Sequence, residues 1–257
     1  MASNSTTYLA KPSGACCLAG NIHKGTPKGK HTTIAGLQTY MATPENPNGN
    51  VIIYYPDVYG LFNNALLLMD GFANAGYLTL GMDYFQGDPV YKYRTAEGKY
   101  EEGFDWEGWL EKHVQGAAVV TPGWVEAVVK EYKKEGVRFG CVGYCFGAPY
   151  VMDALAGELC EVGAFAHPAY LKNHHFENIK KPLLLSCAET DHTFPTESRN
   201  QAIDILIKNK NPYQVQIFSG VAHGFALRCN LDIPYERYVK EQSLKSIVDY
   251  FDFYLSQ

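Results

Sequence analysis

Short β-rich runs alternate with segments of helical periodicity, and this alternation limits the fold more than any other feature of the chain. Val51–Tyr55 is a continuous apolar run typical of a strand buried on both faces. Asn63–Ala75 follows with apolar residues on one helical face and a glycine after its end. Further strands are predicted at His31–Ile34, Leu37–Ala42, Tyr77–Leu80, Val137–Val142, Val162–Ala166, Leu183–Ala188 and Tyr213–Phe218, with helices at Thr121–Gly136, Ala148–Leu155, Pro195–Lys208 and Glu236–Leu255. Strands joined through helices form right-handed βαβ units. The pattern therefore predicts a single α/β domain, with a mostly parallel sheet of about seven or eight strands and helices on both faces.

The first thirty residues show no periodicity, so we expect an N-terminal extension over residues 1–30 and one domain over residues 31–257. Hydrophobic residues make up 46% of the chain, the net charge is −5, and no dense Lys/Arg block occurs. This composition argues against nucleic acid and against anionic membrane surfaces as partners. No apolar run reaches the length of a membrane span, and Met1–Ala10 lacks the pattern of a signal peptide.

The seven cysteines are an odd number in a chain long enough to fold without disulfides. They predict reduced thiols in a cytoplasmic protein, one of which could be chemically special. Cys16, Cys17 and His23 could be imagined as a metal cluster, but their spacing matches no usual zinc pattern. Buried structural thiols are the favoured interpretation, and neither a metal nor a cofactor is predicted.

Gly143-Tyr-Cys-Phe-Gly147 is the most informative motif, because it places a cysteine where a strand turns into a helix. A G-x-nucleophile-x-G turn in this context is a nucleophile elbow, and glycines at both ends let the strand and the helix approach closely. Cys145 would then lie at a helix N-terminus, where backbone N–H groups favour the thiolate. The alternative is a small buried cysteine in a tight turn.

Two further side chains follow the elbow in the order that a catalytic triad on this fold requires. Asp191 lies after the predicted strand Leu183–Ala188, with Glu189 as the alternative acid, and His223 follows the strand Tyr213–Phe218 in a loop before Gly224. Each has a simpler interpretation, since Asp191 could cap the next helix and a lone loop histidine is commonly solvated. His167 competes as the base, but it precedes the acid and is better interpreted as pocket lining. The common order favours Cys145, Asp191 and His223.

The irregular stretch from Gln86 to Val119 carries many aromatic residues beyond the end of a strand, where such sheets build substrate pockets. Ordinary helix packing would explain most of these aromatics individually. The candidate pocket residues are Tyr59, Phe85, Tyr91, Arg94, Tyr144, His167, Phe225 and Arg228.

On these residues the sequence resembles the dienelactone hydrolase family, also called carboxymethylenebutenolidases, and most of all its eukaryotic, fungal-like branch. The resemblance covers about residues 30–255 and rests on the elbow, on Asp191, on His223-Gly-Phe-Ala and on Pro56-Asp-Val-Tyr-Gly60. It implies an α/β-hydrolase fold, a Cys-His-Asp triad and an oxyanion hole from the backbone N–H groups of Phe146 and Val58. It also implies that Asp57 contacts the resting thiol and helps to generate the thiolate.

The resemblance does not extend to the two arginines with which bacterial members hold the dienelactone carboxylate. Gly87 stands at one of these positions, and Arg228 is displaced by one residue from the other. The expected activity is therefore hydrolysis of a small lactone or related activated ester through a cysteine acyl-enzyme, with a homodimer left open. Two alternatives remain: a tailoring hydrolase or thioesterase of secondary metabolism with the same triad, and a non-catalytic binding protein for small ligands.

Overall fold

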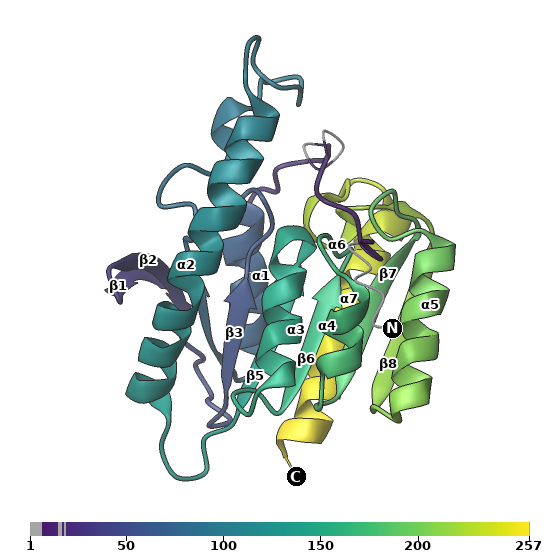
Figure 1. The fold of residues 1–257 in the computed structure, drawn as a ribbon. Coiled ribbons are helices and arrows are strands. Elements are labelled where there is room, and N and C mark those ends of the chain that lie inside the picture. Colours follow the sequence, from purple (N-terminus) through teal and green to yellow (C-terminus); the bar gives the residue numbers. More distant parts are fainter. Residues whose placement is uncertain (1–6, 15–16, 18, 257) are drawn as a thin grey trace.

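The computed structural model describes residues 7–14, 17 and 19–256, and its centre is an eight-stranded sheet (Figure 1). The strand order is β1-β2-β4-β3-β5-β6-β7-β8. The strands are β1 (Lys30–Ile34), β2 (Leu37–Ala42), β3 (Val51–Tyr55), β4 (Leu78–Met82), β5 (Phe139–Tyr144), β6 (Val162–Ala166), β7 (Leu183–Thr190) and β8 (Tyr213–Ala222). Only the β1–β2 hairpin and its pairing with β4 are antiparallel. The predicted mostly parallel sheet is confirmed.

Helices cover both faces of the sheet, as the sequence predicts. One face carries α1 (Asn63–Asn74) and α7 (Pro234–Leu255), which lie behind the sheet in Figure 1. The other carries α2 (Trp106–Tyr132), α3 (Ala148–Ala156), α4 (Asn173–Asn178) and α5 (Thr196–Asn209). Two successive residues of β2 point to opposite faces of the sheet. The Thr39 hydroxyl accepts from Trp124 of α2 at 2.8 Å, whereas the Tyr40 hydroxyl donates to Asp70 of α1 at 2.8 Å. None of the helices in the described ranges is both long and apolar enough to cross a membrane.

The helix predicted to begin at Thr121-Pro122 starts fifteen residues earlier, at Trp106, so the prediction of its start was wrong. The Asp105 side chain caps the first turn by accepting from the Gly108 N–H at 2.9 Å. Pro122 lies inside the helix. A proline at an interior position removes one helical hydrogen bond, but packing along a long helix can offset that loss. Here the Trp109 and Trp124 side chains of α2 are both buried.

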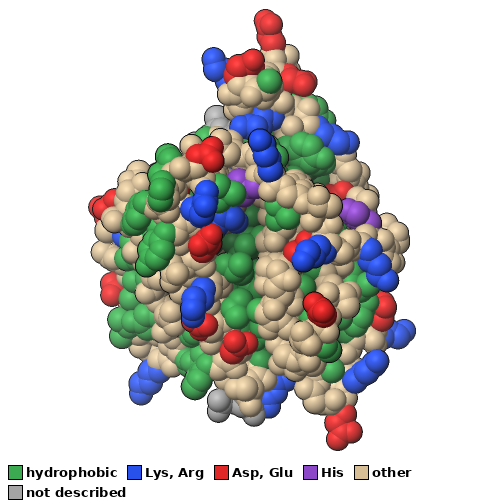
Figure 2. Space-filling view, turned by 180° about the vertical axis from the view of Figure 1, so that it is seen from behind, with side chains coloured by type: hydrophobic (Ala, Val, Ile, Leu, Met, Phe, Trp, Pro, Cys, Tyr) green, Lys and Arg blue, Asp and Glu red, His purple; other side chains and the backbone are tan. Residues whose placement is uncertain are grey.

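The start of α2 and the preceding loop form a projection beyond the body of the molecule (Figure 1). Seen from behind, it carries charged side chains at its tip and hydrophobic side chains at its base (Figure 2). Aromatic rings hold it together, with Tyr93 stacked on Phe104 at 4.2 Å between ring centroids and Trp106 stacked on Trp109 at 5.5 Å. Most of the aromatic residues of this stretch therefore serve packing.

The N-terminal segment crosses the edge of the sheet where the parallel strands end (Figure 1). We call its described residues 7–14, 17 and 19–25 the N-terminal strap. Leu9 and Ala10 donate to the Leu171 carbonyl at 2.8 and 3.0 Å, and Lys11 donates to the Thr193 carbonyl at 2.7 Å. At the far end, Asn21 donates to the Arg228 carbonyl at 2.9 Å. The strap is thus hydrogen-bonded to the domain on both sides of this edge.

Candidate active site

The strand-to-helix turn that the sequence predicts lies at the carboxyl end of β5. Cys145 has a φ of 49°, in the left-handed region that a non-glycine residue occupies at a cost of about 1–2 kcal/mol. A Cβ at Gly147 would lie 2.2 Å from the Tyr55 carbonyl oxygen, and one at Gly143 would lie 2.6 Å from the Gly147 carbonyl oxygen. Both glycines are therefore required by close backbone approach. The packing of the turn fixes the strained Cys145 at the sheet edge.

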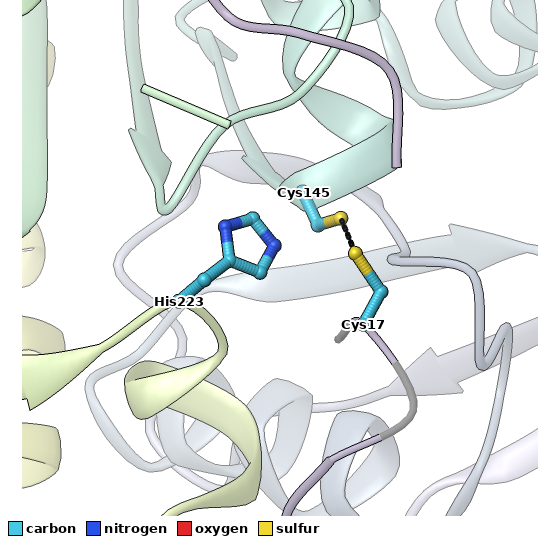
Figure 3. Close-up of side chains that lie close together, drawn as sticks. All are labelled: Cys17, Cys145 and His223. Carbon is cyan, nitrogen blue, oxygen red and sulfur yellow. Dashed lines mark hydrogen bonds between the residues drawn. The ribbon is translucent and has the colours of Figure 1, made fainter. Parts of the chain in front are cut away.

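Asp191 and His223 meet beside this turn because β7 and β8 are neighbours and end at the same edge. His223 Nδ1 lies 2.9 Å from Asp191 Oδ1 and 3.1 Å from Oδ2, and both side chains are 2% exposed. The thiol of Cys145 and a ring nitrogen of His223 lie within 4.8 Å of each other. One ring nitrogen of His223 faces the thiol, while the other points away (Figure 3). The structure therefore brings the three predicted residues together. The alternative acid, Glu189, accepts instead from the Gly220 N–H at 2.7 Å.

The buried His223–Asp191 pair carries opposite charges. Burial opposes the imidazolium, but the Asp191 carboxylate and the Cys17 thiol outweigh burial and raise the pKa of His223 to about 10. Burial also opposes the carboxylate, yet His223 and the Thr193 hydroxyl hold the pKa of Asp191 well below its usual range. Asp191 thus keeps Nδ1 of His223 protonated and leaves the opposite ring nitrogen to face the thiols.

His167 lies next to His223 but in a different electrostatic state. Its ring is T-shaped against His223 at 4.9 Å between centroids and lies 5.7 Å from Phe225. Burial, followed by the repulsion from His223, holds the pKa of His167 well below its usual value. His167 is therefore a neutral, fully buried imidazole, and its role as pocket lining stays a prediction.

The strap covers Cys145, an arrangement that the sequence did not indicate. The Ser13 hydroxyl lies 3.4 Å from Cys145 Sγ, and Cys17 Sγ lies 3.9 Å from the same sulfur (Figure 3). Cys145 and Cys17 are both completely buried. The structure is therefore a closed form of the site. Cys16, the other member of the cysteine pair, lies outside the described residues, and His23 bonds the Cys229 carbonyl at 2.9 Å.

Asp57 and Arg228, both singled out in the sequence, form a buried ion pair with each other. Their side chains are 0% and 1% exposed. Asp57 also accepts from the Tyr59 N–H at 3.0 Å, and the Arg228 guanidinium lies 4.7 Å from the Tyr59 ring centre. Arg228 donates from Nε to the Ala19 carbonyl at 3.0 Å, so the same side chain neutralises Asp57 and holds the strap.

The other predicted pocket residues surround this group. Arg94 donates to the Gly20 carbonyl at 2.6 Å, and Tyr91 is 40% exposed beside Tyr59. Phe85 packs against Phe146 at 5.2 Å between centroids. Tyr144 is buried and lies 5.8 Å from His167. A cavity of about 250 Å³ opens between the strap and the loop after β8, and its lining includes Gly20, His223, Phe225 and Arg228.

Val58 and Phe146, whose N–H groups the resemblance assigns to the oxyanion hole, follow adjacent strands. Tyr55 of β3 pairs with Gly143 of β5, so the two strands end side by side. Val58 lies three residues after β3, and Phe146 lies two residues after β5. The sheet register therefore brings both backbone segments to the edge where Cys145 lies.

Comparisons with known proteins agree with this architecture. The sequence model of the dienelactone hydrolase family matches residues 37–255. "Dienlactone hydrolase 1" of Gibberella moniliformis is 41% identical, covering 100% of both chains. "Hydrolase pyvD" of Aspergillus violaceofuscus is 35% identical over 96% of this chain and 98% of its own. The crystal structure of a putative dienelactone hydrolase from Klebsiella pneumoniae superimposes with a TM-score of 0.70 at 15% identity, covering 90% of this chain and 98% of that one. The fold is therefore that of an α/β-hydrolase.

Proposed function

The chain belongs to the dienelactone hydrolase family and is a hydrolase that acts on lactone or ester bonds, and on this basis we propose that Cys145 is its nucleophile. One observation carries the proposal: a cysteine with a φ of 49° at the end of β5 lies within 4.8 Å of a histidine that is bonded to a buried carboxylate. A nucleophile, a base and a group that orients the base are the three parts that acyl transfer by a side chain requires.

In the first step the Cys145 thiolate attacks the substrate carbonyl carbon, and the N–H groups of Val58 and Phe146 hold the resulting oxyanion. Collapse of this intermediate breaks the bond to the ester oxygen and leaves a thioester on Cys145. The leaving alkoxide takes a proton from the His223 imidazolium. In a lactone the alkoxide stays attached to the acyl group.

In the second step neutral His223 takes a proton from water, and the hydroxide attacks the thioester. The carbon–sulfur bond breaks and releases the carboxylic acid and the Cys145 thiolate, while His223 is again an imidazolium. Asp191 stabilises this charge and keeps the ring oriented in both steps. The role of Asp57 in activating the thiol stays a prediction, as does a homodimer.

The favoured substrates are small lactones or activated esters. A cavity of about 250 Å³ reaches His223, which suits a compact molecule rather than a polymer. Cys145 is completely buried beneath Ser13 and Cys17, so these two residues have to move before a substrate reaches the thiol.

Hydrolysis of p-nitrophenyl acetate and of a panel of small lactones by wild type and Cys145→Ala tests the proposal. Cys160→Ala is the matched control, because Cys160 is equally buried but precedes β6 at the opposite edge of the sheet. We expect Cys145→Ala to lose on the order of 10³-fold or more in turnover, and Cys160→Ala to keep it. Intact mass after brief incubation should show an acyl adduct on wild type. Full turnover by Cys145→Ala would refute the proposed nucleophile.

A further inference from the structure

Three soft donor groups from distant parts of the chain converge beneath the strap. They are the thiol of Cys17, the thiol of Cys145 and a ring nitrogen of His223, all within 4.8 Å of one another (Figure 3). The mechanism proposed above uses Cys145 and His223 but gives no role to Cys17. Cys17 is nevertheless completely buried against the nucleophile, with the two sulfurs 3.9 Å apart.

The spacing of the two sulfurs fits a metal site. Two thiolates bound to one tetrahedral zinc ion at about 2.3 Å have their sulfurs about 3.8 Å apart. The observed separation of Cys17 Sγ and Cys145 Sγ is 3.9 Å. A thiolate and an imidazole nitrogen on the same ion would be about 3.6 Å apart, so small side-chain adjustments within the 4.8 Å limit complete the set. A disulfide would require the same sulfurs to move much closer, to about 2.05 Å.

The surroundings of His223 are those of a metal-binding histidine. Its Nδ1 bonds the Asp191 carboxylate at 2.9 Å, and the Thr193 hydroxyl donates to the same carboxylate oxygen at 2.7 Å. A carboxylate on one ring nitrogen fixes the tautomer and makes the other nitrogen a better ligand. Two thiolates and a neutral imidazole also balance the charge of a divalent cation, which matters in a site with so little exposure.

We propose that Cys17, Cys145 and His223 form a binding site for one soft divalent cation, with zinc as the best fit and water as its fourth ligand. Because the resting form proposed above pairs a Cys145 thiolate with a His223 imidazolium, binding of the ion would release one proton from the Cys17 thiol and one from His223. A bound ion occupies both the attacking sulfur and the base, and it ties the strap to the elbow. The metal-bound protein is therefore an inactive, closed form, and removal of the ion frees the triad.

Titration of the reduced, chelator-treated full-length protein with Co²⁺ under anaerobic conditions tests the site directly. We expect one equivalent to give sulfur-to-cobalt charge-transfer absorption and the visible bands of tetrahedral cobalt, and Zn²⁺ to abolish both. Cys17→Ala should weaken Zn²⁺ binding by more than the roughly 10–100-fold that loss of a supporting partner such as Asp191 costs. Cys160→Ala, which removes a buried thiol outside the cluster, should bind like wild type.

Each contrary result is distinct. Equal Zn²⁺ affinity in Cys17→Ala and Cys160→Ala, or cobalt spectra without thiolate bands, would overturn the site. Only the expected inhibition of hydrolysis by Zn²⁺ rests on the proposed function. If the metal-free protein hydrolyses no ester but gives the Cys17-dependent cobalt spectrum, the nucleophile proposal fails and the metal site stands.

Discussion

Replacing Arg228 with methionine should destabilise the protein strongly, because it leaves the Asp57 carboxylate without its cation. Both side chains are almost fully buried, at 1% and 0% exposure, and the guanidinium also bonds the Ala19 carbonyl. Methionine keeps most of the apolar stem of the side chain and removes the charge. The perturbation therefore tests the ion pair more than the packing.

The expected cost follows from this burial. Removing one partner of a buried ion pair costs about 3–5 kcal/mol, chiefly because the remaining charge stays out of water. Each kcal/mol lowers the Tm of a domain of 150–250 residues by roughly 2–4 °C. For this slightly longer chain of 257 residues we therefore expect Arg228→Met to lower the Tm by about 6–20 °C.

Thermal unfolding followed by circular dichroism measures this shift, with Arg237→Met as the control. Arg237 is exposed and its guanidinium bonds the nearby Leu231 carbonyl, so loss of its charge should change stability by about 0.5 kcal/mol or less. Adding Asp57→Asn to Arg228→Met should recover part of the lost stability, because no buried charge then remains. A Tm equal to that of Arg237→Met, or additive losses in the double variant, would refute the reasoning.

Three further predictions concern the triad, the elbow and the strap. The pKa of His223 is about 10 when folded against 6.5 as the ordinary value, so its stabilisation is complete below pH 6.5 and is lost as pH rises through 10. The Tm of wild type should therefore exceed that of His223→Gln by less and less between pH 7 and 10, and a constant difference would contradict the ion pair. Burial lowers the pKa of Lys240 to about 8, which makes stability rise with pH, but both proteins contain Lys240 and the comparison cancels its effect. Gly147→Ala should lower the free energy of unfolding, measured with urea, by about 3 kcal/mol or more, because the new Cβ would lie 2.2 Å from the Tyr55 carbonyl oxygen. Gly157→Ala serves as the control, because its Cβ would meet no atom closer than 3.7 Å. Arg94→Ala removes a charged hydrogen bond to Gly20 worth about 1.5–3 kcal/mol, and it should raise the rate of iodoacetamide labelling of Cys145, measured by mass, roughly tenfold or more. Replacing the exposed Lys92 with alanine should leave the labelling rate unchanged, and equal rates in the two variants would show that Arg94 does not hold the strap.

The sequence predicted the part of the fold that local patterns determine. Apolar runs such as Val51–Tyr55 identified the central strands, since a strand covered on both faces is apolar throughout. The elbow was predictable because the glycines of Gly143-Tyr-Cys-Phe-Gly147 report on backbone approach within a few residues. Asp191 and His223 were found through their order after strands, and parallel strands necessarily end at one edge.

The errors arose where a local signal was outweighed by tertiary contacts. Thr121-Pro122 is a good helix start by itself, but the Asp105 cap and the packing of Trp109 and Trp124 extend α2 through it. The pairing of Asp57 with Arg228 joins two residues that the sequence had singled out for other reasons. No local pattern reports a contact between residues so far apart in the chain.

The strap was the least predictable element, because its position depends on backbone hydrogen bonds to remote residues rather than on its own periodicity. Its two ends bond the domain through Leu9, Lys11, Asn21 and the carbonyls of Ala19 and Gly20. Between these ends, the contacts of Ser13 and Cys17 with Cys145 are weak thiol contacts at 3.4 and 3.9 Å. A soft cation bound by Cys17, Cys145 and His223 would therefore add a strong contact between the strap and the turn at Cys145.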